Sequence, residues 1–526
     1  MSRRGWLAIM ASSAALGGSA TAAAADWNTY RFDVTGSGNP GEALTEGQAQ
    51  GFHQVWTASA PPLSNPVTAG GVLYVIDNVD VVLDALDASS GQAIWSRNVA
   101  ANVTVACASK SVSLGPVGAA GVVGTNVVLP GGDGVVYALD RNSGAVVWQT
   151  QVADPASKDE FLWSSTFSAT GRLYFGVATL LEDQCGEAPG HLVALDGSSG
   201  AIVATWSGAV VWSTPTYDAE THKLFVSTGS GLPGATLSQS IVAIDPATLA
   251  TLDSFTVPGA FALDYDFGGS PTLFDLPGGS RLVAAINKNG TVYALNRDDL
   301  AAGPVWTYVV ATPGANPDSG QGSVVSPAYA SGTLFVGGGA TPDGHPGSVA
   351  ALDPATGNQK WVYHPNGYVL PALTATGDVL FAGVTDPTTS VGALIVLSQA
   401  TGALLYTQST STPVWGEPTY SNGMLFFGDE LGKLYALAPG PAASGSSGGT
   451  GGSTGGSTDG GSGITPPSQG ASSVDAGVVP PGGKAGGCSS AGGATAPLLP
   501  LVLVVLALRS RGSPLHRGRS RRTVHA

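Results

Sequence analysis

The stretch that decides the fold is GGDGVVYALDRNSGAVVW, residues 131–148. Two β-rich runs, residues 135–139 and 145–148, flank a polar corner of the form Asp-x-x-x-Gly. Runs rich in valine and aromatic residues that are bounded by Gly and Asp are typical of strands, so the stretch predicts strand, turn and strand. A unit of this size cannot bury its apolar face alone, and copies of it must therefore pack against one another.

The same phrase recurs through the chain, and its copies align on the residue that ends the third strand of each. These residues are Asp87, Asp140, Asp196, Asp245, Asn296, Asp353, Ser398 and Ala438. Their spacing of 40 to 57 residues leaves room for four strands of about five to six residues with turns. An aromatic residue closes the fourth strand of the first seven copies, and the eighth copy lacks one.

A strand with the missing aromatic residue lies ahead of the first copy, at residues 54–57 around Trp56. If this strand completes the last sheet, the ring closes and no long edge stays exposed. The sequence therefore predicts an all-β, eight-bladed β-propeller over residues 26–440, closed by an N-terminal strand. The alternative is a linear β-solenoid, which would not need that strand.

Residues 1–25 predict an export signal. Arg3 and Arg4 precede an apolar run over residues 6–16, and small residues end at Ala25, which makes Asp26 the expected first residue after cleavage. The paired arginines also resemble a twin-arginine signal, which implies export in the folded state. A basic start alone explains two arginines, so both export routes remain open.

The C-terminal part of the chain predicts an anchor. Residues 441–487 are rich in Gly and Ser and too poor in apolar residues to fold, which is typical of a flexible tether. In residues 488–526, Cys488 precedes an apolar segment and an arginine cluster, a pattern that resembles the sorting signals of myxobacterial surface proteins. That resemblance implies processing near Cys488 and a propeller held at the cell surface; an ordinary C-terminal membrane helix is the alternative. In both cases the propeller is outside the cytoplasm, and only this segment contacts the membrane.

Composition excludes some functions. Residues 26–440 hold 12 Lys and Arg against 34 Asp and Glu, and this acidic balance argues against nucleic acid as a partner. No Cys-x-x-Cys-His motif occurs, so no covalent c-type haem is expected. Whether Cys107 and Cys185 form a disulfide in an oxidising compartment remains open.

The phrase at residues 132–148 resembles the repeat of pyrroloquinoline quinone (PQQ) enzymes and of their non-catalytic relatives, and the resemblance extends over residues 51–440. The repeat serves strand pairing and packing between blades, so it says little about activity.

Three further stretches resemble site segments of quinoprotein alcohol dehydrogenases, and of polyvinyl alcohol dehydrogenases in particular. The resemblance implies PQQ as the cofactor, Trp212 as the ring that stacks under the quinone and Asp266 as the catalytic base. It also implies that Lys288 polarises the quinone carbonyl. A separate match, Trp415-Gly416 in the last blade, implies that Trp415 is a second quinone contact. A base, a cation and a flat apolar surface are what alcohol oxidation on a quinone requires. Each residue also has a structural explanation: a turn aspartate, an exposed hairpin lysine and a packing aromatic.

The sequence departs from this family at the positions expected for metal. The family's adjacent cysteine pair is missing, because Ala108 follows Cys107, and Ser230 replaces a Ca²⁺-binding Asn. Glu187 is an approximate match to the Ca²⁺-binding carboxylate, with Glu182 or Asp183 as alternatives. Bound Ca²⁺ is therefore weakly supported. The propeller histidines show no ligand spacing; they are His53, His191, His222, His345 and His364.

Two functions remain open. The first is a surface-anchored quinoprotein that oxidises a small or polymeric alcohol and passes electrons to a separate acceptor. It predicts that Trp212, Asp266 and Lys288 meet at one mouth of the channel. The second is a non-catalytic propeller that binds an envelope protein or glycan, and it predicts a plugged channel.

Overall fold

The computed structural model describes residues 25–59, 64–77, 82–98, 103–107, 110–114, 118–158, 160–179, 190–230, 237–259, 264–430 and 433–441, with residues 103–107 and 110–114 described by their backbone alone. The predicted export signal up to residue 24 lies outside this part, as do the tether beyond residue 441 and the C-terminal segment with Cys488.

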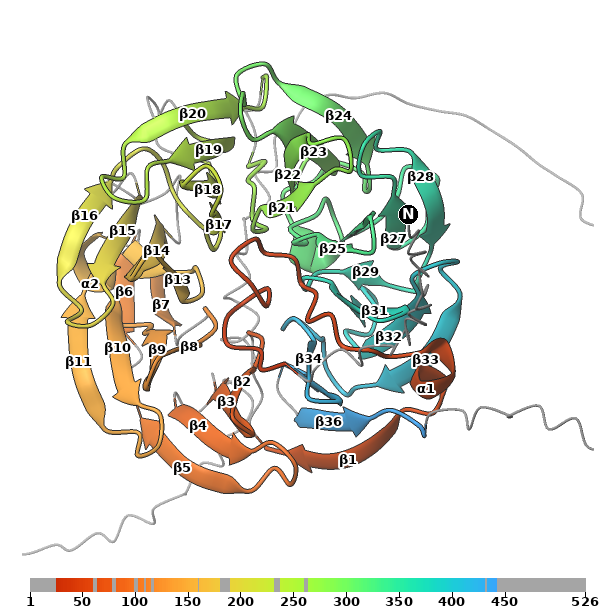
Figure 1. Ribbon diagram of the computed structural model, residues 1–526, viewed down its shortest axis with the longest axis horizontal. Helices are drawn as coiled ribbons and strands as arrows, with labels where there is room; N and C mark the ends of the chain where they lie inside the picture. Colours follow the sequence, from red (N-terminus) through yellow and green to blue (C-terminus); the bar gives the residue numbers. More distant parts are fainter. Residues whose placement is uncertain are drawn as a thin grey trace, which may run out of the picture. The chain divides into compact units, whose positions relative to one another are not determined.

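Eight antiparallel sheets form a ring around a central axis, and the first strand of each blade lies nearest the axis (Figure 1). This confirms the predicted eight-bladed β-propeller. The blades are, in chain order: β2 (Val67–Ala69), β3 (Val72–Asp77), β4 (Val82–Asp87), β5 (Ala93–Asn98); β8 (Gly121–Val123), β9 (Asn126–Pro130), β10 (Val135–Asp140), β11 (Val146–Gln151); β13 (Phe167–Ala169), β14 (Arg172–Thr179), β15 (His191–Asp196), β16 (Ile202–Trp206); β17 (Thr216–Asp218), β18 (Lys223–Ser227), β19 (Ser240–Ile244), β20 (Thr251–Thr256); β21 (Thr272–Asp275), β22 (Arg281–Ile286), β23 (Thr291–Asn296), β24 (Pro304–Val309); β25 (Ala328–Ala330), β26 (Thr333–Gly338), β27 (Ser348–Leu352), β28 (Gln359–Tyr363); β30 (Thr374–Thr376), β31 (Val379–Thr385), β32 (Gly392–Ser398), β33 (Leu404–Ser409); and β34 (Thr419–Ser421), β35 (Met424–Gly428), β36 (Leu434–Ala438) with β1 (His53–Ala58).

A few elements add to this plan. Short strands β12 (Glu160–Leu162) and β29 (Tyr368–Val369) extend the third and seventh blades by pairing with β14 and β31. β6 (Val103–Cys107) and β7 (Lys110–Leu114) form a separate hairpin. The helical segments α1 (Glu46–Gln50), α2 (Pro155–Lys158) and η2 (Pro317–Ser319) are short. None of the helices in the described ranges has the length and apolar character needed to cross a membrane.

The N-terminal strand closes the ring as predicted. β1 pairs antiparallel with β36, so that Trp56 lies opposite Ala436 and Thr57 opposite Tyr435. The indole of Trp56 also donates to the carbonyl of Ala88 in the first blade, at 3.1 Å. One strand therefore completes the last sheet and contacts the next blade, which leaves no unpaired edge at the closure.

The Asp-x-x-x-Gly corner explains why the repeat needs its glycine and its tryptophan. In the second blade the side chain of Asp140 accepts the amide of Ser143 at 2.9 Å, and the amide of Gly144 donates to the carbonyl of Asp140 at 2.8 Å. Gly144 has φ +67°, and a Cβ there would lie 2.7 Å from the ring of Trp95 in the preceding blade. The same packing recurs in four further pairs: Trp56 on Gly91, Trp148 on Gly200, Trp306 on Gly357 and Trp361 on Gly402. Each of these tryptophans thus joins one blade to the next.

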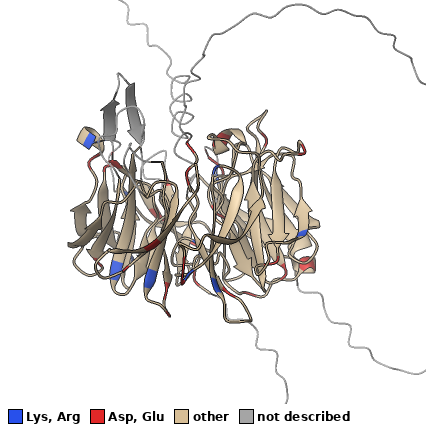
Figure 2. Cartoon of the chain, turned by 90° about the horizontal axis from the view of Figure 1, so that it is seen from above, with Lys and Arg blue, Asp and Glu red and all other residues tan. Residues whose placement is uncertain are grey.

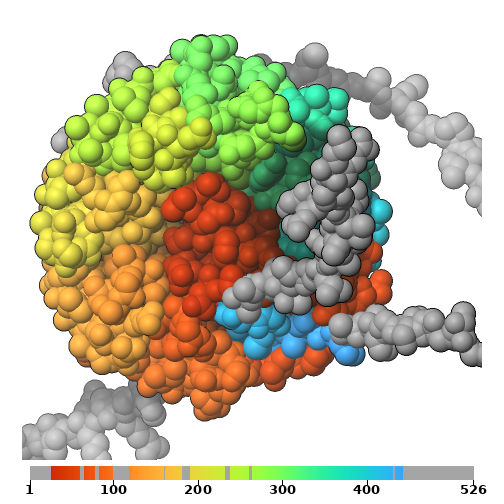
Figure 3. Space-filling model, viewed as in Figure 1, coloured from red at the N-terminus to blue at the C-terminus, as the bar shows by residue number. Residues whose placement is uncertain are grey.

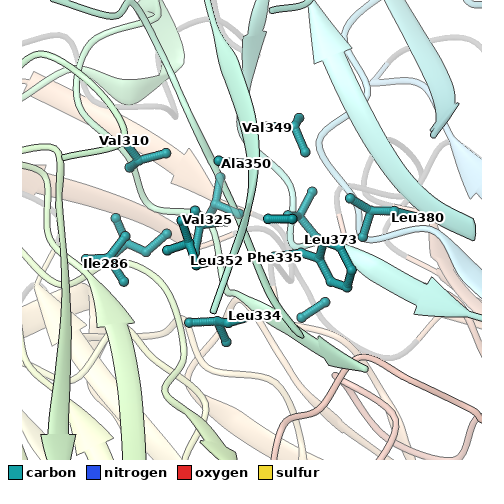
Figure 4. Close-up of a cluster of buried hydrophobic side chains, with 14 of the residues drawn as sticks. Ile286, Val310, Val325, Leu334, Phe335, Val349, Ala350, Leu352, Leu373 and Leu380 are labelled. Carbon is teal, nitrogen blue, oxygen red and sulfur yellow. The ribbon is translucent and has the colours of Figure 1, made fainter. Parts of the chain in front are cut away.

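The core consists of apolar side chains that pack between the faces of neighbouring blades. Figure 4 shows one such layer, in which Ile286, Phe335 and Leu380 come from three successive blades. Every residue of β27 is buried, whereas the outer strand β28 is half-buried or exposed. Charged residues are few, and the lysines and arginines are scattered rather than gathered in a patch (Figure 2).

An N-terminal segment that the sequence analysis did not identify, residues 27–42, fills the centre of the ring on one face (Figure 3). It hydrogen-bonds to all eight blades. The bonded pairs are Trp27 with Thr68, Asn28 with Val122, Thr29 with Thr166, Val34 with Tyr217, Thr35 with Leu273, Ser37 with Tyr329, Gly38 with Ala375, and Glu42 with Asn422 and Gly423. Most of these partners lie along the first strands or in the turns that follow them, and Thr166 directly precedes β13. Arg31 reaches further along the axis, to Leu373, Pro327 and Glu417, which precede the first strands of their blades.

Candidate functional site

A lysine between two aspartates lies in the turn that follows β22. The ammonium of Lys288 is 2.7 Å from Oδ2 of Asp266 and 3.1 Å from Oδ1 of Asp264. Asp266 is 2% exposed, and the side chains of Lys288 and Asp264 are 14% and 33% exposed. One cation therefore holds a buried carboxylate and a partly exposed one.

The sequence Asn-Lys-Asn-Gly builds the turn that presents this lysine. The side-chain oxygen of Asn287 accepts the amide of Asn289 at 2.9 Å, and its amide group donates to the carbonyl of Tyr265 at 2.5 Å. Gly290 ends the turn with φ +78°. The amide of Lys288 donates to the carbonyl of Asp266 at 2.8 Å, so the segment ahead of β21 and the turn after β22 are joined by backbone as well as by charge.

Trp212 and Asp266 lie against the same glycine, Gly229. A Cβ on Gly229 would lie 2.4 Å from Nε1 of Trp212 and 3.4 Å from Oδ1 of Asp266, so the indole and the carboxylate pack against the same residue. The neighbouring amide, that of Ser230, donates to Asp266 Oδ1. Trp212, Asp266 and Lys288 are therefore brought together, as the quinoprotein interpretation predicts.

Trp163 also lies at the site, although the sequence motifs did not indicate it. Its ring centroid lies 4.6 Å from that of Trp212 with the planes tilted by 46°. Trp163 starts the phrase Trp-Ser-Ser-Thr ahead of the third blade, as Trp212 starts Trp-Ser-Thr-Pro ahead of the fourth, and this likeness was the available signal. Its indole N–H is buried and has no hydrogen-bond partner among the described residues.

The two carboxyls titrate differently because their surroundings differ. Burial acts to raise the pKa of Asp266, but the charge of Lys288 and hydrogen bonds from Asp264, Lys288 and Ser230 outweigh it and lower that pKa. Burial and the negative charge of Asp266 raise the pKa of Asp264 to about 7, although Lys288 opposes them. The pair therefore shares one proton near neutral pH.

Trp415 lies at the equivalent position ahead of β34 in the eighth blade, opposite the fourth blade in the ring. Two further acidic groups border this end of the channel. Burial raises the pKa of Asp318, against the nearby charge of Lys288. Burial and Asp429 raise the pKa of Glu430 to about 7.

The described residues suit a planar quinone better than a calcium ion. Two indoles and an ammonium converge, and the indole N–H of Trp163 is a buried donor that a ligand oxygen would satisfy. The oxygens of Asp266 already accept from Ser230 and Lys288, so these residues present no shell of six or more oxygens. Glu187, Glu182 and Asp183 lie outside the described residues, and the Ca²⁺ ligand set stays a prediction.

The ring of eight blades and the tryptophan-bearing corners define a PQQ-repeat β-propeller. The chain matches the family model described as outer membrane protein assembly factor BamB over residues 40–176, 190–368 and 346–440, which is more than half of its length. The chain therefore belongs to this family of PQQ-repeat propellers.

Relatives with assigned activities are dehydrogenases. Polyvinylalcohol dehydrogenase of a Pseudomonas species is 23% identical over 322 residues, which are 52% of this chain and 49% of the relative. Quinoprotein ethanol dehydrogenase of Pseudomonas aeruginosa is 26% identical over 214 residues, 32% of this chain and 33% of the relative. The match thus spans between a third and a half of each relative.

Solved structures show the same fold. A europium-containing methanol dehydrogenase superposes with a TM-score of 0.66 at 15% identity, covering 78% of this chain and 98% of that one. Quinohemoprotein alcohol dehydrogenase from Comamonas testosteroni superposes with a TM-score of 0.64 at 17% identity, covering 80% of this chain and 82% of that one. At these identities the likeness shows a shared fold.

Proposed function

We propose that this protein binds PQQ and oxidises an alcohol at the site formed by Trp212, Asp264, Asp266 and Lys288. The observation that carries the proposal is that one partly buried ammonium bridges two carboxyls beside a tryptophan that packs on the same glycine as Asp266. A base, a cation and an aromatic surface are thereby gathered from segments up to 76 residues apart in the sequence.

Each group at the site has a distinct role in the proposed oxidation. Bound PQQ supplies the acceptor for the two electrons and the hydrogen that leave the alcohol carbon. The Asp264–Asp266 pair takes the hydroxyl proton, and Asp264, with a pKa of about 7, is poised to accept it near neutral pH. Lys288 holds both carboxyls in place and provides positive charge where negative charge develops. Trp212 and Trp163 form an apolar wall that excludes water from that side.

The substrate is a small or polymeric alcohol, and electrons leave to a separate acceptor. In this proposal the chain is exported by residues 1–25 and held at the cell surface by residues 488–526 after the tether. The acidic balance of residues 26–440 supports the absence of nucleic acid among its partners.

Titration of the full chain with PQQ tests the proposal. We expect a saturable absorbance change at micromolar PQQ and dye reduction with primary, secondary or polymeric alcohols. The rate should rise with pH through about 7, because Asp264 must lose its proton to act as a base.

Asp266→Asn should abolish turnover and spare binding, and Lys288→Ala should weaken both. Lys360→Ala, which removes an exposed lysine far from the site, is the control. Absence of PQQ binding would end the enzyme proposal, and an unchanged rate in both Asp264→Asn and Asp266→Asn would end the assignment of the base to this pair.

The second candidate is a non-catalytic propeller that binds an envelope protein or glycan. The closure of one end of the axis by residues 27–42 favours it, since a scaffold needs no open channel. PQQ binding decides between the two functions.

A further inference from the structure

Two histidines and an aspartate meet on the sixth blade, although the sequence showed no ligand spacing among the propeller histidines. Asp343 and His345 lie in the turn between β26 and β27, and His364 follows β28. Their ligand atoms all lie within 4.8 Å of one another. Nε2 of His345 is 3.6 Å from Oδ2 of Asp343, and the two imidazole rings stack at 3.8 Å with their planes 16° apart. This is the one such group of His, Cys, Asp or Glu in the described ranges.

The backbone of the turn holds these side chains in a defined arrangement. Thr341 and His345 close it, because the amide of Thr341 donates to the carbonyl of His345 at 2.9 Å and the amide of His345 donates to Oγ1 of Thr341 at 3.0 Å. The hydroxyl of Thr341 also donates to Oδ1 of Asp343 at 2.5 Å, which leaves Oδ2 directed toward His345. Gly344 has φ +92° and permits the tight reversal.

The second histidine is oriented by a bond to the backbone. Nδ1 of His364 lies 3.2 Å from the carbonyl of Gly347, and since a carbonyl only accepts, this nitrogen carries the proton. In the neutral ring with this tautomer, Nε2 of His364 is the nitrogen that can bind a metal. A ligand histidine whose other nitrogen donates to a carbonyl is the usual arrangement around protein-bound metal ions.

The carboxyl of Asp343 presents an oxygen, Oδ2, that faces His345. Two imidazoles and a carboxylate are a ligand set for Zn²⁺ and the other late divalent metals, whereas Ca²⁺ and Mg²⁺ prefer oxygen ligands alone.

We propose that Asp343, His345 and His364 bind one divalent late transition metal ion, with Zn²⁺ as the probe, and leave at least one coordination position to water. Bonds of about 2.0 to 2.2 Å bring tetrahedral ligand atoms closer than 4.8 Å, so the side chains must move together by about an ångström. Asp343 and His345 are exposed on a short turn, and rotation of these side chains achieves this.

The proposed metal site is linked by backbone hydrogen bonds to the loop between β24 and β25, which in turn contacts the turn with Lys288. Ala340, next to the metal turn, donates its amide to the carbonyl of Gly320 at 2.8 Å, and Gly314 in the same loop donates to the carbonyl of Lys288 at 3.1 Å. Metal binding itself requires neither PQQ nor an alcohol.

Calorimetric titration of the untagged full chain with Zn²⁺, after removal of metal by a chelator, tests the proposal. We expect one Zn²⁺ site that is lost in the double variant His345→Asn/His364→Asn and weakened at least tenfold in each single variant. Affinity should fall from pH 7.5 to 5.5, because protons compete for the imidazoles. His53→Asn, which changes an exposed histidine at the closing strand, is the control and should bind like the wild type.

Thermal unfolding provides a second readout that does not rely on calorimetry. Zn²⁺ should raise the midpoint for the wild type and for His53→Asn but not for the double variant, because only a folded site binds the ion. Circular dichroism of the metal-free variants shows that the fold is intact. If the double variant bound Zn²⁺ with the affinity and stoichiometry of the wild type, the binding would be adventitious and the proposal would be wrong.

Discussion

Lys288 is the positive charge that Asp264 and Asp266 share, and the two aspartates respond to it differently. It is the cation between Asp264 and Asp266, and it keeps the pKa of the buried Asp266 low against the effect of burial. Asp264, which is further from the lysine and more exposed, takes the opposite shift. Two neighbouring aspartates thus gain different roles from position alone, one a fixed anion and one a group that exchanges its proton near neutral pH.

Replacing Lys288 by Met should destabilise the fold more at high pH than at low pH. The pKa of Asp264 in the folded chain, about 7, is above its value in the unfolded chain, so this carboxyl stabilises the fold below pH 4 and loses that contribution as the pH rises through 7. Without the lysine, both carboxylates repel at pH 8, and we expect a loss of about 2 kcal/mol. Urea unfolding at pH 5 and pH 8 measures it, with Lys360→Met as control. An equal loss at both pH values would contradict this electrostatic account.

Gly229 sets the position of Trp212. In Gly229→Ala the new methyl group would meet the indole 2.4 Å away and displace it, at a cost of about 1 to 3 kcal/mol. We expect weaker quinone binding and a shift in tryptophan fluorescence. Gly278→Ala is the matched control, because a Cβ there meets nothing within 4 Å. If both variants behaved alike, Gly229 would not support the tryptophan.

At the scale of elements, the contact between an outer-strand tryptophan and the corner of the next blade is the repeated unit. Trp95 covers Gly144 and donates its indole N–H to the carbonyl of Arg141 at 3.0 Å. Trp361 does the same on Gly402, with the carbonyl of Gln399 at 2.8 Å. Conformation and packing both demand glycine, because the backbone is left-handed and the ring lies where a Cβ would be.

Two glycines allow the effect of backbone conformation to be measured apart from the effect of packing against a tryptophan. Gly144 and Gly332 both have φ +67°, but only Gly144 lies under a tryptophan, and a Cβ on Gly332 meets nothing within 4 Å. Gly332→Ala should cost about 1 kcal/mol from backbone strain alone. Gly144→Ala should cost about 1 to 3 kcal/mol more, because it also displaces Trp95. Thermal and urea unfolding measure the difference, and equal losses would show that packing on the glycine contributes nothing.

For the whole molecule, the N-terminal segment and the closing strand act together. Residues 27–42 bind every blade at the axis, and β1 then completes the last blade, so the start of the chain determines both the centre and the closure. A buried ion pair lies at the axis: Arg31 donates to Glu417, and both side chains are 2% exposed or less. Arg31 also donates to the carbonyls of Leu373 and Pro327, which ties the seventh and sixth blades to the segment.

Arg31→Met should destabilise the ring by about 3 to 5 kcal/mol, because the buried Glu417 loses its only positively charged partner among the described residues. The double variant Arg31→Met/Glu417→Gln should recover part of this loss, since the uncompensated charge is gone. Arg97→Met, at an exposed arginine, is the control. Urea unfolding measures all four proteins. A double variant less stable than Arg31→Met would show that the charge of Glu417 is not the source of the loss.

The sequence by itself determined the ring. Strand, corner and tryptophan lie within 18 residues of one another at residues 131–148, and the missing aromatic of the last copy pointed to Trp56. Local periodicity and the need to pair every edge are enough to predict eight blades and their closure. The resemblance to quinoprotein segments also selected Trp212, Asp266 and Lys288, which the fold then placed in contact through Gly229.

Only the tertiary structure decided the rest. Trp163 beside Trp212, the raised pKa of Asp264 and the segment across the axis all depend on groups brought together from different blades. His345 and His364 carry no motif in the sequence, and the pairing of β27 with β28 sets them face to face. Sequence patterns record the local period of strands and turns, whereas burial, charge coupling and ligand geometry arise from distances in space that no such period encodes.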